Sequence, residues 1–348
     1  MKIGLIGLPR VGRTTVFNLL TGRGEATGGG GREAHRATIK VPDPRVDRLT
    51  AIFKPKKTTY AEIEFLDLPA FEVGRGGIPS ERLSEMRNVD ALVHVLRAFP
   101  GDEPGGGAAV DAAALEQELI LTDLLLVERR LERLQADIAK GRRELLPEQT
   151  LLTRLQEALG DEQPLRRLPL EEAEESLVRG YQFLSKPPMV LLANCGREPD
   201  ARALAGAAAL AEAGGLAFLS LNAVDEWEIA QLAPEDRQAF LADIGVSEPA
   251  RDRFIRACYE LLALASFFTV GDDEVRAWTI ERGLPAVRAA GKVHSDLERG
   301  FIRAEVIAYA TFIARGSLAE ARKHGELRLE GKEYPVQDGD IVNIRFNV

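Results

Sequence analysis

A glycine-framed turn near the start of the chain has the spacing of a phosphate-binding loop. Gly7 and Gly12 are followed by Arg13 and Thr14, which matches the pattern G-x-x-x-x-G-K-[ST] except that arginine stands in place of lysine. Backbone amides that converge between a buried strand and the start of a helix bind an anion. We therefore expect the phosphates of a nucleotide to contact the loop and the start of the helix, namely Pro9, Arg10, Val11, Gly12, Arg13, Thr14 and Thr15.

The arginine at position 13 changes the chemistry that is expected of the loop. A lysine ammonium is a compact point charge, whereas a guanidinium is a wide planar fork, so Arg13 keeps the charge but not the shape. Phosphate binding is expected to survive better than hydrolysis, so we expect weak ATPase or GTPase activity at most. Two positions are open to the long side chain: inside the phosphate site, or outward to a carboxylate such as Glu72 or Glu198.

Two other interpretations of the turn remain open at this point. The segment Gly7-x-Pro9-x-x-Gly12 is one substitution away from the dinucleotide fingerprint G-x-G-x-x-G, although Pro9 has no N–H for a pyrophosphate. The same residues are also compatible with a tight strand-to-helix turn that binds nothing.

A second chemically active position is Asp67, which follows an apolar segment at residues 60–66. A carboxylate just past a buried strand commonly holds Mg²⁺ or a water molecule. The hydroxyl after the basic residue of a phosphate loop commonly binds the same ion. We therefore expect Thr14 and Asp67 to hold a Mg²⁺ ion that arrives with the nucleotide, with a turn or helix-capping role for Asp67 as the alternative.

The composition is that of a globular protein with room for two or three compact units, since 45% of its 348 residues are hydrophobic and 28% are charged. A net charge of −9 provides no general positive field for DNA or an anionic membrane. Two cysteines form no disulfide framework, four histidines lack the paired spacing of a metal site, and no signal-peptide pattern is present. We expect a cytoplasmic protein with neither DNA nor membrane as a partner.

Strands and helices alternate along most of the chain. Segments typical of buried strands are residues 2–6, 38–41, 60–66, 91–96, 188–193 and 217–221. This alternation predicts an α/β fold with a mostly parallel sheet that helices cover on both faces.

A long helical segment at residues 111–185 interrupts this alternation. Its first half carries an apolar stripe at spacings of four and three: Ile120, Leu124, Val127, Leu131, Leu134 and Ile138. A second stripe follows a break at Gly141: Leu152, Leu155 and Leu159. Two facing stripes predict an antiparallel helical hairpin that packs within its own chain.

The pattern changes to short alternating strands from Ser266 onward. The predicted strands are residues 267–270, 275–280, 327–329 and 341–346, with a β-hairpin joining the first two. Ser295-Asp296-Leu297-Glu298 predicts a capping box at the start of a helix. We expect a separate α+β module in which Trp278, Phe301 and Phe346 are core residues.

With these elements in place, the chain resembles the YchF-type Obg-like ATPases, a branch of the TRAFAC P-loop GTPases with a helical insertion and a C-terminal TGS domain. The matching segments are residues 41–49, 54–57, 89–97, 275–279, 300–307 and 336–340. The resemblance rejects the dinucleotide interpretation of Pro9. It implies a P-loop G-domain over residues 1–110 and 186–265, an inserted helical or coiled-coil domain over 111–185, and a β-grasp TGS domain over 266–348.

The resemblance also implies a purine nucleotide, ATP or GTP, on the loop. Asn194, Asn222 and Ala223 match the positions that the family places beside the base. By the same resemblance, the partner is the ribosome or RNA, reached through the TGS and helical domains.

Departures from the family pattern cluster at the nucleotide site. Besides Arg13, Gly31 stands near the position of a switch threonine, and Ala70 replaces a switch glycine. These losses together are expected to slow phosphoryl transfer by several orders of magnitude. The alternative function is therefore a catalytically inactive pseudo-NTPase that acts as a scaffold for protein or RNA.

Overall fold

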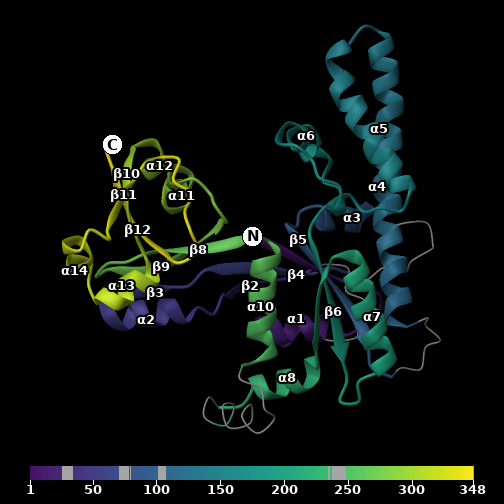
Figure 1. Cartoon of the computed structure of the whole chain (residues 1–348). Coiled ribbons are helices and arrows are strands. Elements are labelled where there is room, and N and C mark those ends of the chain that lie inside the picture. Colours follow the sequence, from purple (N-terminus) through teal and green to yellow (C-terminus); the bar gives the residue numbers. More distant parts are fainter. Residues whose placement is uncertain are drawn as a thin grey trace. The chain divides into compact units, whose positions relative to one another are not determined.

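The structure is a computed structural model that describes residues 1–25, 34–69, 78, 80–100, 107–233, 236 and 248–347 (Figure 1). Gly31, Ala70 and Glu72 lie outside the described residues, so the predictions that rest on them find no structural counterpart here. The chain divides into two compact units. The first comprises Met1–Thr38 and Glu64–Arg251, and the second comprises Ile39–Ile63 and Asp252–Val348.

The first unit is built on a six-stranded sheet in the order β2-β4-β1-β5-β6-β7. Its strands are β1 (Lys2–Ile6), β2 (His35–Lys40), β4 (Glu62–Asp67), β5 (Ala91–Ala98), β6 (Met189–Cys195) and β7 (Ala217–Leu221). The pairings β4–β1, β1–β5, β5–β6 and β6–β7 are all parallel, which confirms the predicted α/β fold. Parallel strands bring their C-terminal ends to one edge of the sheet, where ligands of such folds bind.

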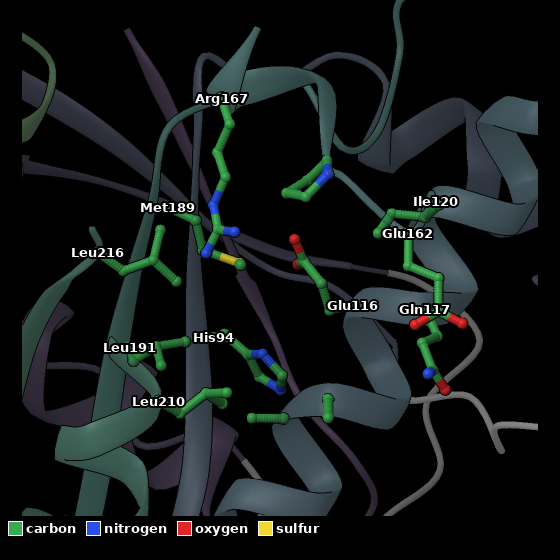
Figure 2. Close-up of a pocket in the computed structure, with 13 residues that line it drawn as sticks. His94, Glu116, Gln117, Ile120, Glu162, Arg167, Met189, Leu191, Leu210 and Leu216 are labelled. Atoms are coloured by element: carbon green, nitrogen blue, oxygen red, sulfur yellow. The ribbon is translucent and has the colours of Figure 1, made fainter. Parts of the chain in front are cut away.

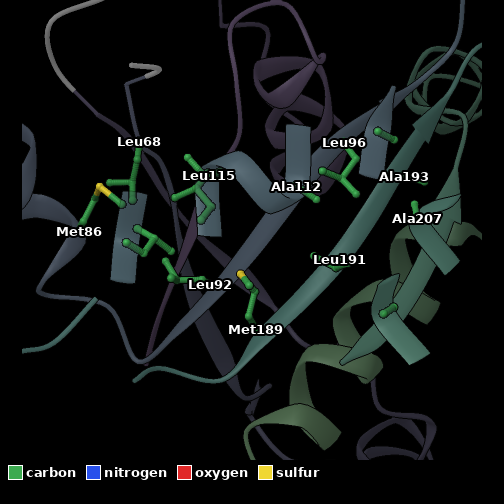
Figure 3. Close-up of a cluster of buried hydrophobic side chains, with 14 of the residues drawn as sticks. Leu68, Met86, Leu92, Leu96, Ala112, Leu115, Met189, Leu191, Ala193 and Ala207 are labelled. Atoms are coloured by element: carbon green, nitrogen blue, oxygen red, sulfur yellow. The ribbon is translucent and has the colours of Figure 1, made fainter. Parts of the chain in front are cut away.

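The described part of the first unit also contains helices, some of which cover the sheet. They are α1 (Arg13–Thr21), α3 (Ser80–Met86), α4 (Ala108–Ala139), α5 (Leu146–Gly160), α6 (Glu172–Val178), α7 (Ala201–Gly214) and α8 (Ala223–Ala230), with 3-10 turns at Arg143–Leu145, Leu165–Arg167 and Arg179–Tyr181. Leu92 and Leu96 of β5 and Leu191 of β6 form one buried cluster with Leu115 of α4 and Ala207 of α7 (Figure 3). Because side chains alternate along a strand, the even-numbered residues of β5 face α4 and α7.

The predicted helical hairpin consists of α4 and α5 (Figure 1). Both predicted stripes contribute to one hydrophobic cluster: Ile120, Val127, Leu131 and Leu134 of α4 are buried with Leu152, Leu155 and Leu159 of α5, and Leu124 and Ile138 are partly buried beside them. Residues at alternating spacings of four and three share one helix face, so the sequence pattern alone placed them correctly.

Asp123 on the buried side of α4 holds the returning chain where it approaches β6. One carboxylate oxygen accepts a hydrogen bond from the Leu184 amide at 2.9 Å, and the other accepts bonds from the Ser185 amide and hydroxyl, each at 2.7 Å. Burial raises the pKa of Asp123 to about 6, although these hydrogen bonds favour the ionised form. The carboxylate therefore fixes the base of the hairpin at an energetic cost.

This raised pKa predicts a measurable dependence of stability on pH. Since the pKa of Asp123 exceeds its ordinary value of 3.8, the folded chain binds more protons than the unfolded chain between pH ~4 and ~6, and this residue's contribution to stability rises as pH falls through that window. Asp123→Asn is expected to lower the free energy of unfolding by about 2 kcal/mol at pH 7, because an amide cannot accept all three bonds. The difference in the free energy of unfolding between the wild type and Asp123→Asn should be about 1 kcal/mol larger at pH 5 than at pH 7.

Urea unfolding of the wild type and Asp123→Asn at both pH values measures these differences. Glu132→Gln removes an exposed carboxylate from the same helix and should show neither effect. If the stability difference between the wild type and Asp123→Asn is the same at pH 7 and pH 5, the raised pKa of Asp123 is contradicted.

The second unit contains a mixed sheet in the order β11-β10-β12-β8-β9-β3. Its strands are β3 (Lys57–Thr59), β8 (Leu264–Thr269), β9 (Glu274–Glu281), β10 (Phe301–Ala308), β11 (Arg328–Glu330) and β12 (Asp340–Phe346), and its helices are α2 (Pro44–Phe53), α11 (Ala286–Val293), α12 (Ser295–Arg299), α13 (Tyr309–Arg315) and α14 (Leu318–Lys323). Helix α10 (Ala250–Leu261) precedes β8 in the chain. Strands β8 and β9 pair antiparallel, which confirms the predicted hairpin.

A segment from the N-terminal part of the chain completes this second unit. Strand β3 pairs in parallel with β9. At the start of α2, Arg45 forms ion pairs with Asp43 at 2.8 Å and Asp338 at 2.7 Å, and its guanidinium lies 5.0 Å from the centre of the Phe268 ring. Residues 39–63 therefore fold with the C-terminal module.

Two details of the C-terminal module differ from the sequence prediction. Helix α12 is capped by His294, whose Nδ1 accepts a hydrogen bond from the Asp296 amide at 3.2 Å, so the predicted capping by Ser295 is wrong by one residue. Phe301 is buried and Trp278 packs against the same cluster, as predicted. Phe346 is 45% exposed, because it is the last residue of β12 and lies beyond that cluster.

Within the described ranges, no helix combines the length and the apolar character needed to cross a lipid bilayer.

Candidate nucleotide site

The predicted phosphate loop leaves the C-terminal end of β1 and enters α1. A Cβ atom on Gly7 would lie 2.6 Å from the Val95 carbonyl oxygen, and a Cβ atom on Gly12 would lie 2.1 Å from Asn194 Nδ2. Gly12 also has a left-handed backbone, with φ of 83°, and is the N-cap residue of α1. Both positions therefore require glycine. Since Gly12 has no side chain with which to cap the helix, the first turn of α1 has the character of an anion site.

The other predicted loop residues differ in their exposure. Val11 is buried, Thr15 is half-buried, and Pro9 and Arg10 are exposed at the tip of the loop. Arg10 also has a left-handed backbone, with φ of 64°. The loop thus has one apolar anchor and a solvent-facing side that a nucleotide can approach.

Arg13 lies inside the site and pairs with Asp67. Its Nε donates to one carboxylate oxygen of Asp67, and its Nη1 donates to the Gly7 carbonyl oxygen at 3.2 Å. Thr14 Oγ1 donates to the other carboxylate oxygen at 2.8 Å. The Arg13 and Asp67 side chains are 12% and 2% exposed, respectively. Of the positions that the sequence leaves open, the guanidinium takes the inward one and does not turn toward Glu198.

The pair formed by Thr14 and Asp67 has the donor chemistry that Mg²⁺ prefers, because a hydroxyl and a carboxylate are both hard oxygen ligands. Among the described residues, no group of three or more His, Cys, Asp or Glu side chains is arranged to hold a metal ion. An ion at Thr14 and Asp67 would therefore take its remaining ligands from phosphate and water. The residues fit such an ion once Arg13 releases the oxygen that it now contacts.

The three residues predicted beside the base lie where β6 and β7 end. Asn194 is buried, with its Nδ2 donating to the Val11 carbonyl at 3.0 Å and its Oδ1 accepting from the Ala223 amide at 3.2 Å. Asn222 is the N-cap of α8 and accepts hydrogen bonds from the Val224 and Asp225 amides. Asn194 thus ties the phosphate loop to the start of α8, a structural role that sequence reasoning missed.

The sequence analysis also did not identify an ion-pair cluster that lies beside Asn222. Arg197 donates to Asp225 and to Glu228, each at 2.8 Å, and so links the segment after β6 to α8. These residues and Asn222 line a cavity of about 550 Å³. Charges spaced so far apart in the chain give no local signal, because their pairing depends on how β6 and α8 are placed.

Comparisons with known proteins agree with this architecture. A family model described as YchF-GTPase_C, Protein of unknown function (DUF933), matches residues 264–347. The "Ribosome-binding ATPase YchF" of Bacillus subtilis (strain 168) is 37% identical over 364 residues, which cover 100% of both chains. The protein of the same name from Pasteurella multocida (strain Pm70) is 37% identical over 360 residues, which cover 100% of this chain and 99% of that protein.

A solved structure extends the likeness to the whole fold. The Schizosaccharomyces pombe YchF GTPase superposes with a TM-score of 0.87 at 26% identity, over 99% of this chain and 97% of that chain. The resemblance inferred from the sequence is confirmed, because the relatives cover both units and the phosphate loop. The chain belongs to the YchF family and has its P-loop GTPase fold.

Proposed function

We propose that this protein binds a purine nucleotide, ATP or GTP, on the loop from Gly7 to Thr14, with weak or absent hydrolysis. The observation that carries the proposal is the glycine-framed loop, in which the uncapped first turn of α1 follows Gly12 directly. Such a helix start binds phosphate through its amides and its dipole. Two basic residues, Arg10 and Arg13, stand on or beside this loop and complement a polyphosphate.

Mg²⁺ accompanies the nucleotide in this proposal. Thr14 and Asp67 would hold the ion, and the ion would supply positive charge to the phosphate oxygens. After releasing Asp67, Arg13 would neutralise phosphate charge. Asn194 would keep the phosphate loop tied to the start of α8, beside which the base is expected. Arginine in place of the loop lysine is the reason for expecting slow hydrolysis.

The proposed partner is the ribosome or another part of the translation machinery, and the proposed location is the cytoplasm. Both follow from the relatives that are named ribosome-binding ATPases. The helical domain at residues 111–185 and the TGS domain at residues 266–348 are the proposed contact regions. Co-sedimentation of the full chain with 70S ribosomes tests this part, and a chain that stays in the supernatant with ATP, with GTP and without nucleotide would contradict it.

A scaffold without nucleotide chemistry is the second candidate. The observation that favours it is the ion pair of Arg13 with Asp67, which satisfies both residues without any ligand. In that case the loop is structural, and the two units serve only as contact surfaces for protein or RNA.

Calorimetric titration of ATP and GTP into nucleotide-free protein, with Mg²⁺ and then with EDTA, separates the two candidates. The proposal predicts binding of at least one nucleotide with a Kd of about 100 μM or tighter. Absence of heat for both, with thermal melting unchanged by either nucleotide, would assign the scaffold role.

A further inference from the structure

A cavity of about 190 Å³ lies between the central sheet and two of its covering helices, and none of its lining residues belongs to the phosphate loop (Figure 2). Its floor is apolar, with Met189 and Leu191 from β6 and Leu210 from α7. Cavities of about 150 Å³ accept an aromatic ring such as benzene, so a space of this size is large enough for a small organic molecule.

His94 places an unsatisfied imidazole in this cavity. The residue faces α4 and α7 from the middle of β5 and is 1% exposed. Its Nε2 atom is buried and has no hydrogen-bond partner. Burial, and to a lesser degree the charge of Arg166, lower the pKa of His94 to about 3, so the ring is neutral at physiological pH. A neutral imidazole offers one donor and one acceptor, and leaving either unmade inside a protein is costly.

The charged groups around the cavity are of both signs. Glu116 of α4 receives hydrogen bonds from both terminal nitrogens of Arg166. Glu162 and Arg167, of opposite charge, line the cavity and are exposed at its mouth. Because the Glu116 carboxylate is paired with Arg166 and the other two charges lie at the exposed mouth, the inner part of the cavity offers an uncharged ring apolar walls and the unpartnered Nε2 of His94.

We propose that this cavity is a second binding site, which takes a small uncharged aromatic molecule bearing a single hydrogen-bonding group directed at His94. An indole-sized heterocycle with a ring N–H fits the volume and the apolar floor, and it would donate to His94 Nε2 in the tautomer whose ring proton is on Nδ1. Figure 2 shows Leu191 and Leu210 beside the imidazole of His94, whereas the Glu116 carboxylate points away from the imidazole, toward the side of Arg167. The site lies at the base of the helical hairpin, because Glu116 belongs to the same helix as the hairpin stripe.

Indole and indene provide a matched pair of probes, since they have nearly the same shape and differ in the ring N–H. Titration of each into the full-length protein, followed by calorimetry, is expected to give indole a roughly fivefold to tenfold lower Kd than indene, which corresponds to one buried hydrogen bond. In ¹⁵N-histidine-labelled protein, indole should shift the ring nitrogens of His94, and indene should shift them much less.

Two variants complete the test. His94→Phe keeps an aromatic ring without nitrogens and should reduce the affinity ratio of indole to indene to about one, with indene binding retained. Leu210→Trp should fill the cavity and weaken both probes at least roughly tenfold. The proposal is overturned if neither probe binds the wild type at roughly 5 mM, where a Kd of 1 mM would register, or if the ratio is unchanged in His94→Phe. Unshifted His94 nitrogens in indole-saturated wild type also overturn it, whether or not the variants fold.

Discussion

Replacing Gly12 with alanine is expected to abolish nucleotide binding, with a loss of at least about 100-fold in ATP affinity. The new Cβ would lie 2.1 Å from Asn194 Nδ2, at a residue whose φ is 83°. Asn194 cannot move aside cheaply, since its amide is hydrogen bonded to both Val11 and Ala223. The left-handed backbone costs an alanine about 1–2 kcal/mol, and displacing Asn194 leaves buried backbone groups unpaired at about 1–3 kcal/mol.

Gly22 provides the matched control at the other end of the same helix. It is the C-cap of α1, also with a left-handed backbone at φ of 69°, but nothing lies within 4 Å of the position of its Cβ. Gly22→Ala should therefore lose only about 1–2 kcal/mol of stability and keep its ATP affinity. Calorimetry and urea unfolding of both variants make the comparison. Equal ATP affinity in the two variants would mean that the loop does not bind the phosphates.

Arg13→Lys is expected to make nucleotide binding strongly dependent on Mg²⁺. In the wild type the ion must displace the guanidinium from Asp67, and the several kcal/mol needed to break this ion pair offset most of the free energy gained from binding the ion. Removing Mg²⁺ with EDTA should therefore change the ATP affinity of the wild type by less than about threefold. A lysine ammonium cannot bond Asp67 and the Gly7 carbonyl with the same planar fork, so the variant should gain at least about tenfold in ATP affinity on adding Mg²⁺.

Arg23→Lys makes the same exchange at an exposed site beyond α1, where the guanidinium donates to the Arg36 carbonyl at 2.9 Å. Its Mg²⁺ dependence should equal that of the wild type. A wild-type protein that already gains tenfold from Mg²⁺, or an Arg13→Lys variant that gains nothing, would refute the competition between the ion and Arg13. If neither the wild type nor Arg13→Lys binds ATP at all, the result points instead to the scaffold role.

The parallel sheet, the helical hairpin and the phosphate loop were predictable because each is recorded locally in the sequence. Apolar runs, alternating spacings of four and three, and two glycines five positions apart depend on residues close together in the chain. The hairpin stripe from Ile120 to Ile138 is the clearest case, since one helix face is enough to specify it. The misplaced cap at Ser295 shows the limit of such patterns, because His294 caps α12 through an unusual acceptor.

Tertiary structure decided what the site residues contact. Sequence identified Arg13, Thr14 and Asp67 as the chemically active set, but only the pairing of β1 with β4 brings Asp67 beside the loop, so that Arg13 turns onto it. The same holds for Asn194, for the unsatisfied His94 and for residues 39–63 in the second unit. Spacing along the chain specifies a helix face or a turn, whereas contacts between distant residues depend on strand order and register, which no local pattern encodes.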